Sequence, residues 1–141
     1  MKFILMLCMV VTLGLSPLFA AEKETTPTQK EIIVKLGQEV VIDGEKLRLE
    51  FSQLLGDSRC PVDVECIWQG NAEITIGVGA INKRKRIGEY FKLNTALEPQ
   101  EVKYKNYTIK FVKLSPDPKA GVVIDPSQYE ATLLITNQRS R

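Results

Sequence analysis

Two cysteines six positions apart are the residues best suited to chemistry in this chain. Cys60 and Cys66 lie in the run DSRCPVDVECIWQG, residues 57–70. A thiol pair can form a disulfide, hold a metal ion or carry out redox exchange. Catalytic dithiols usually lie two residues apart at the start of a helix, whereas Pro61 and Asp63 indicate a turn. We therefore expect a structural disulfide, with a metal or redox pair as the alternative.

Three acidic residues around the cysteines are the next candidates. Asp57, Asp63 and Glu65 could gather around a calcium ion, or two of them could serve as the acid and base of a glycosidase. Their spacing does not match an EF-hand loop, and nothing in the sequence fixes the distance between the carboxylates. Turn formation by the aspartates and solvation of Glu65 are the simpler interpretation. We predict no catalytic residue, no metal ligand and no cofactor.

Histidine is absent from the whole chain. This excludes Ser-His-Asp and Cys-His catalysis and most catalytic zinc sites, which depend on imidazole. The 19 basic and 17 acidic residues give a net charge of only +2. A nearly neutral protein lacks the basic face that phosphates require, so we expect no nucleic-acid partner.

The first 20 residues have the three parts of a secretory signal peptide. Lys2 is followed by an apolar run over residues 3–15, and Ala20 and Ala21 precede a charged segment. The apolar run is too short to span a bilayer comfortably. We expect cleavage after Ala20 or Ala21, export to the periplasm or the medium, and no stable membrane span afterwards. An uncleaved anchor is the alternative.

The third cysteine of the chain does not fit a lipid anchor. Cys8 follows Leu7 rather than a small residue, and it lies inside the apolar run rather than after it. Residues 21–30 are polar and are predicted to form a flexible tether.

Alternation of apolar and polar residues dominates residues 31–137, which we predict to be one domain. Leu47, Leu49 and Phe51 alternate with polar neighbours, and residues 72–78 repeat the pattern. Turn signals such as Asp43-Gly44 separate the runs. About seven or eight short strands predict an all-β fold, an antiparallel β-sandwich, with a small β-barrel as the alternative. Residues 138–141 are a polar tail.

Trp68 is expected to pack against the disulfide. If residues 64–68 are extended, Val64, Cys66 and Trp68 point to one side, so the indole would close one end of the core. The alternative is an exposed aromatic side chain that contacts a sugar or a peptide.

One dense cluster of charge lies between two predicted strands. It consists of Lys83, Arg84, Lys85 and Arg86. The cluster could bind anionic lipid, an envelope polyanion or an acidic partner. It could equally be a solvated turn that prevents association of sheet edges. We treat it as a possible partner surface.

A long connection with three prolines covers residues 115–126. Residues 122–124 within it are apolar and form either a short edge strand or part of a binding loop. The sequence leaves these two readings equal.

The runs DSRCP, VDVECIWQG and NAEITIGV, together with a last strand containing Tyr129, Ala131 and Leu133, resemble a motif of short exported bacterial proteins of uncharacterised function. The resemblance implies an exported, disulfide-containing β domain and brings no activity, ligand or catalytic residue.

These observations favour a non-enzymatic binding module for a protein or a cell-envelope component. An enzyme inhibitor is a specific form of that function. The alternative is a small hydrolase that uses carboxylates or a metal ion. The sequence makes no prediction of oligomeric state.

Overall fold

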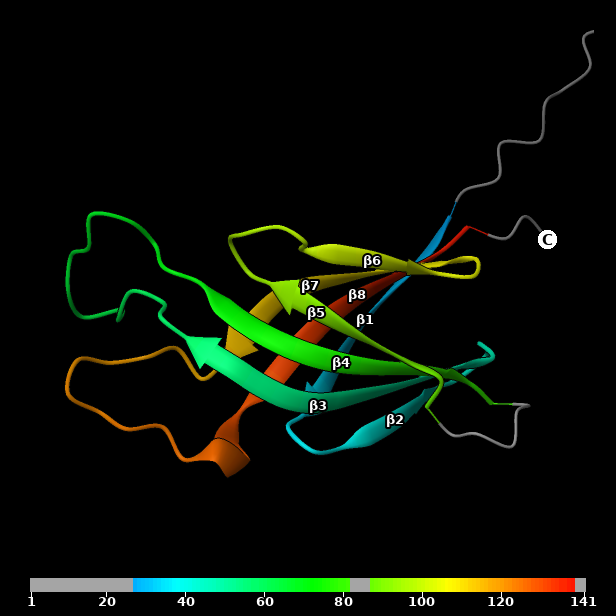
Figure 1. The fold of residues 1–141 in the computed structure, drawn as a ribbon, viewed down its shortest axis with the longest axis horizontal. Coiled ribbons are helices and arrows are strands. Elements are labelled where there is room, and N and C mark those ends of the chain that lie inside the picture. Colours follow the sequence, from blue (N-terminus) through cyan, green and yellow to red (C-terminus); the bar gives the residue numbers. More distant parts are fainter. Residues whose placement is uncertain (1–26, 82–86, 139–141) are drawn as a thin grey trace, which may run out of the picture.

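The computed structural model describes residues 27–81 and 87–138. Two antiparallel four-stranded sheets pack face to face, in the orders β1-β8-β7-β6 and β2-β3-β4-β5 (Figure 1). The elements are β1 (Thr28–Lys35), β2 (Glu39–Ile42), β3 (Leu47–Asp57), β4 (Ala72–Ala80), β5 (Glu89–Asn94), β6 (Glu101–Tyr104), β7 (Tyr107–Ser115), the 3-10 helix η1 (Pro126–Gln128) and β8 (Glu130–Asn137). The prediction of an all-β sandwich with about eight strands is confirmed.

The core lies between the sheets and follows from the alternation in the sequence. Leu47, Leu49 and Phe51 of β3 are fully buried, and they face a second sheet that contributes Phe111 and Leu133. Each large apolar side chain buried in this way stabilises the fold by about 2 kcal/mol. The described residues contain no helix long and apolar enough to cross a membrane.

β1 begins earlier than the sequence predicts. Thr28 pairs with Asn137 and Lys30 pairs with Ile135, so three residues of the predicted tether belong to the sheet. The polar composition of residues 28–30 did not predict a strand. An edge strand can form there because it needs main-chain pairing more than it needs apolar side chains.

The connections between strands lie at the two ends of the sandwich. The β1–β2, β3–β4, β5–β6 and β7–β8 connections lie at one end, which we call the loop end, on the left in Figure 1. The start of β1 and the end of β8 lie at the opposite end. The two longest connections between described strands, residues 58–71 and 116–129, both belong to the loop end.

Candidate functional site

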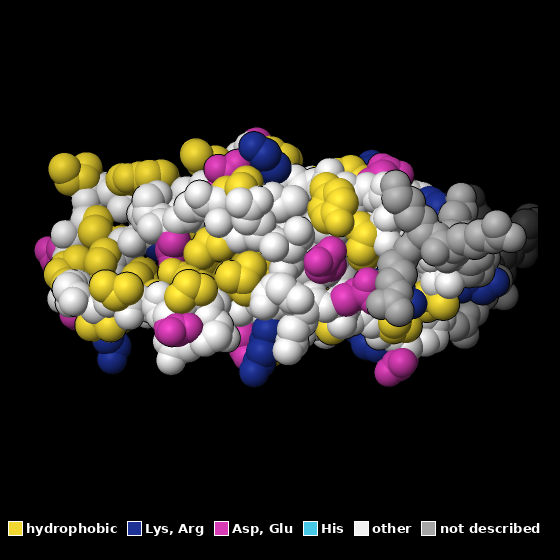
Figure 2. Space-filling view, turned by 60° about the horizontal axis from the view of Figure 1, so that its bottom comes forward, with side chains coloured by type: hydrophobic (Ala, Val, Ile, Leu, Met, Phe, Trp, Pro, Cys, Tyr) yellow, Lys and Arg dark blue, Asp and Glu magenta, His cyan; other side chains and the backbone are white. Residues whose placement is uncertain are grey.

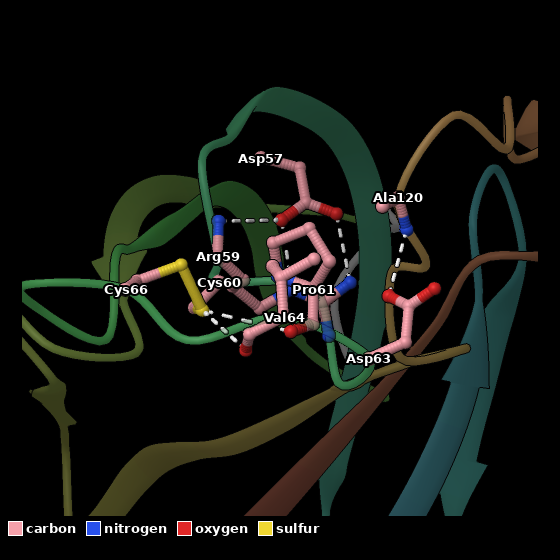
Figure 3. Close-up of a disulfide and its surroundings, with 8 residues drawn as sticks. All are labelled: Asp57, Arg59, Cys60, Pro61, Asp63, Val64, Cys66 and Ala120. Carbon is pink, nitrogen blue, oxygen red and sulfur yellow. Dashed lines mark hydrogen bonds and ion pairs between the residues drawn. A yellow bond between two sulfur atoms is a disulfide. The ribbon is translucent and has the colours of Figure 1, made fainter.

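Two long loops lie together at the loop end. The disulfide loop, residues 58–71, joins β3 to β4, and the long loop, residues 116–129, joins β7 to β8. Cys60 and Cys66 form a disulfide with a Cα–Cα distance of 6.0 Å, as predicted (Figure 3). The disulfide closes the tip of its loop and leaves neither cysteine as a free thiol to hold a metal ion.

Arg59 fixes the disulfide loop to the strands beneath it. Its Nε and Nη2 atoms each donate to a different oxygen of Asp57 at 2.7 Å. Its Nη1 donates to the carbonyl of Leu114 at 2.5 Å and its Nη2 to the carbonyl of Pro116 at 2.8 Å. Only 12% of the Arg59 side chain is exposed. One guanidinium therefore joins the end of β3 to the start of the long loop.

Asp57 is held in its charged form by this contact. Burial, the largest single influence, raises the pKa of Asp57, but hydrogen bonds and charge from Arg59 together outweigh it and hold that pKa below its usual value. The Tyr129 hydroxyl adds a donor at 3.4 Å. Burial, followed by the charge of Asp57, raises the pKa of Tyr129. The contacts with Arg59 and Tyr129 thus favour the charged form of Asp57.

Two direct hydrogen bonds join the loops nearer their tips. The main-chain N–H of Val62 donates to the carbonyl of Pro118 at 3.0 Å. The main-chain N–H of Ala120 donates to Oδ1 of Asp63 at 2.8 Å (Figure 3). Asp63 lies in a turn, as predicted, and it also links two segments that lie 57 residues apart in the chain. The two loops therefore form one unit, which we call the paired loops.

The base of the disulfide loop is closed by main-chain pairing. Ser58 N–H donates to the Asn71 carbonyl and Cys60 N–H to the Gln69 carbonyl, both at 2.8 Å. Gly70 has a φ of +73°, and a Cβ atom placed on it would lie 1.9 Å from the carbonyl oxygen of Ser58. The two chains can approach this closely only where a glycine stands.

The prediction that Trp68 packs into the core is wrong. Its side chain is 54% exposed and it lies outside the core cluster. Residues 64–68 are not a strand, so the expected alternation of side chains does not exist there. The disulfide and the short turns within the loop set the direction of Trp68 instead.

Exposed apolar side chains gather on the paired loops, where Figure 2 shows yellow side chains at the left end. The residues, with their exposed fractions, are Val62 (62%), Val64 (45%), Ile67 (107%), Trp68 (54%), Val122 (58%) and Val123 (94%). We call these six residues the apolar tip. Soluble proteins scatter single apolar residues over their surfaces, but a group on neighbouring loops marks an interaction site.

The long loop resolves the two readings of residues 122–124. None of these residues is in a strand. Ile124 packs against the core, whereas Val122 and Val123 point outward. Asp125 follows as the N-cap of η1, and hydrogen bonds from the Ser127 hydroxyl and N–H lower its pKa. The segment is therefore a loop anchored at Ile124, with two apolar side chains left in solvent.

A pocket of about 260 Å³ lies beside the paired loops. Its walls are partly apolar and partly polar, and they include Arg59, Val62, Thr95, Val112, Leu114 and Pro118. Because its walls come from the disulfide loop, the long loop, β7 and the β5–β6 connection, the pocket joins four elements of the loop end. It is a hollow in which one side chain of a bound molecule can be received.

Lys83, Arg84, Lys85 and Arg86 lie outside the described residues. In the part of the chain that the structure describes, no three His, Cys, Asp or Glu side chains come together as a metal site would require. Asp57 and Asp63 are used in the hydrogen bonds above, and no observation favours the hydrolase alternative.

Arg59 and Ile67 are contributors that the sequence analysis did not single out, whereas Val123 belongs to the apolar segment 122–124 that it named as an edge strand or part of a binding loop. The only sequence signal of Ile67 is that it stands outside any alternating run. Comparison with family models, curated proteins and solved structures finds no match for this chain.

Proposed function

We propose that this chain is an exported, non-enzymatic binding module that docks on another protein through the paired loops. The observation that carries the proposal is the apolar tip, in which Ile67 and Val123 are almost completely exposed. Exposed apolar side chains cost free energy in water, and a partner that covers them recovers it.

The rigidity of the surface supports a binding role. The disulfide, the Arg59 contacts and the Asp63–Ala120 hydrogen bond hold both loops before any partner arrives. A surface ordered in advance loses less entropy on association than a flexible one. Two projecting apolar loops also suit insertion into a cleft, and this makes an inhibitor of an extracellular enzyme the narrowest form of the proposal.

Export is supported by two sequence features. The first 20 residues follow the pattern of a secretory signal peptide. The Cys60–Cys66 disulfide is of the kind that persists in oxidising compartments. We therefore propose that the protein works in the periplasm or outside the cell.

Crosslinking in cells tests the proposal. A C-terminally tagged protein is crosslinked, and bound components are recovered from the envelope fraction and the medium. We expect a component whose recovery falls about tenfold in the Ile67→Ser, Val123→Ser variant. Ile33→Ser is the matched control, because Ile33 is 60% exposed on the edge strand β1 and belongs to neither of the paired loops.

Equal recovery by the wild type and the loop variant would refute the paired loops as the docking surface. A further variant with Lys83, Arg84, Lys85 and Arg86 changed to Gln tests the other predicted surface. Loss of recovery in that variant alone would transfer the binding role to the basic cluster.

A further inference from the structure

The charge around the apolar tip is predominantly negative. The four connections of the loop end, residues 36–38, 58–71, 95–100 and 116–129, contain five acids and two bases, so their net charge is −3. The acids are Asp63, Glu65, Glu98, Asp117 and Asp125, and all five are exposed. The whole chain carries +2, so this end differs in sign from the molecule.

The two bases of the loop end offset little of the negative charge on its outer surface. Arg59 is 12% exposed and its guanidinium is engaged by Asp57. Lys119 alone is an exposed base of these loops. Lys113, on the adjoining strand β7, is paired with Asp117 at 3.1 Å and offsets that one acid, so Asp63, Glu65, Glu98 and Asp125 form the rest of the border. A molecule that approaches the loop end therefore meets an apolar centre with an acidic border.

The acids alternate with the apolar residues along the disulfide loop. Asp63 lies between Val62 and Val64, and Glu65 follows Val64 directly. In the long loop, Asp125 follows the apolar segment 122–124 and is kept charged by Ser127. Burying the apolar tip thus brings the carboxylates to within a few ångströms of the covering surface, where complementary charge matters most.

We infer that the partner of the apolar tip is a protein whose apolar surface is bordered by lysine and arginine side chains. This inference rests on the proposed function and names the kind of partner. Such a partner offsets the acidic border while it covers the valines, Ile67 and Trp68.

The same charge argues against two other occupants. An anionic lipid bilayer would repel the border, even though exposed Trp and aliphatic side chains at loop tips suit an interfacial region. A second copy of this chain, docked tip to tip, would bring two surfaces of −3 together. Electrostatic repulsion opposes both arrangements.

Trp68 is the only tryptophan in the chain and serves as the reporter for the test. The probes are two amphipathic 14-residue peptides, one of Leu and Lys and one of Leu and Glu, which present an apolar stripe with basic or acidic borders. Vesicles of phosphatidylglycerol with phosphatidylethanolamine, and of phosphatidylcholine alone, are the lipid probes. The titrations follow the Trp68 emission of the purified protein at low salt.

We expect the Leu-Lys peptide to bind about tenfold more tightly than the Leu-Glu peptide, and the difference to shrink at high salt. Glu65→Lys is expected to weaken Leu-Lys binding by about threefold or more. Glu89→Lys makes the same change of charge on an exposed residue at the start of β5, at the opposite end, and should leave binding within about twofold.

Three outcomes would overturn the inference: no binding of the Leu-Lys peptide, equal binding of both peptides, or a shift of Trp68 emission with the anionic vesicles. The crosslinking experiment separates this failure from failure of the proposed function. A captured component that needs Ile67 and Val123 but is indifferent to Glu65→Lys would preserve the docking surface and refute its charge preference.

Discussion

Arg59 shows how one side chain can organise a surface without belonging to it. It satisfies a carboxylate and two main-chain carbonyls from three segments, and it lies beneath the loops rather than at their tips. The bidentate contact with Asp57 uses the planar geometry that only arginine offers. The remaining partner, Asp57, would be a poorly solvated carboxylate without it.

Arg59→Met is expected to lower the free energy of unfolding by about 2 to 3 kcal/mol at neutral pH, since it strands a largely buried charge. Asp57 has a lowered pKa in the folded protein, so its contribution is present above the ordinary Asp range and is lost as pH falls through the folded pKa. The difference in stability between wild type and variant should therefore shrink below about pH 4.

Urea unfolding of both proteins between neutral and acidic pH measures this difference. Acidic groups other than Asp57 and Asp117, whose Oδ1 lies 3.7 Å from Nη1 of Arg59, contribute equally to both and cancel. A gap that stays constant down to the lowest pH at which both fold would show that Asp57 does not depend on Arg59.

Gly70 is the second residue on which the loop geometry depends. Gly70→Ala places a methyl group against the main chain at Ser58, which cannot move aside. We expect a loss of roughly 3 kcal/mol or more. Gly121→Ala is the matched control, since Gly121 has a φ of +69° but nothing within 4 Å of an added Cβ. Its cost should be about 1 kcal/mol, from the left-handed conformation alone.

Circular dichroism in a urea titration compares the two glycine variants, because Trp68 is already half exposed and reports unfolding weakly. Equal losses would mean that backbone conformation, and not the close approach to Ser58, explains the requirement for glycine at position 70.

At the scale of elements, strands were predictable and loops were not. Alternation locates β3 because Leu47, Leu49 and Phe51 have to face the core while their neighbours face water. Residues 58–71 and 116–129 obey no period, since their geometry comes from hydrogen bonds between segments distant in the chain. The spacing of Cys60 and Cys66 was enough to predict their disulfide. The same spacing could not show that Trp68 would be exposed, because residues 64–68 do not form the strand whose alternation would have turned it toward the core.

The disulfide loop provides the prediction at this scale. The Cys60→Ser, Cys66→Ser variant should lose about 2 kcal/mol, the loop-closure contribution of a short ring. The variant should still fold, because neither cysteine belongs to the core cluster. It should also lose affinity for any partner of the paired loops, since a freed loop must be ordered on binding.

Wild-type protein treated with reductant should show the same loss of stability, whereas the double serine variant should not respond to reductant. Complete unfolding of the variant would instead make the disulfide essential to the sandwich. Alkylation of both thiols in unreduced protein would contradict the disulfide itself.

At the scale of the whole molecule, the interior stabilises the fold and the loop end carries the proposed binding surface. The two sheets bury a core made almost entirely of apolar residues, with Asn71, Asn94 and Thr108 as the buried polar residues of the described chain. Nδ2 of Asn71 donates a hydrogen bond to Oδ1 of Asn94 at 2.8 Å, and this contact lies beneath the loop end. Alternation in the sequence is enough to predict such a core. It cannot predict which exterior end will carry function, because that depends on which connections are long and which side chains remain uncovered.

The pairing of Thr28 with Asn137 has a consequence for how the protein is presented. The start of β1 and the end of β8 therefore lie side by side, opposite the loop end. β3 runs for 11 residues from that side to the loop end. At about 3.3 Å per residue, the sandwich is a spacer of roughly 35 Å. When the domain is attached to a cell surface or a sensor chip through the start of β1 or the end of β8, the loop end points away from that surface. The apolar tip and its acidic border are then exposed to the solution.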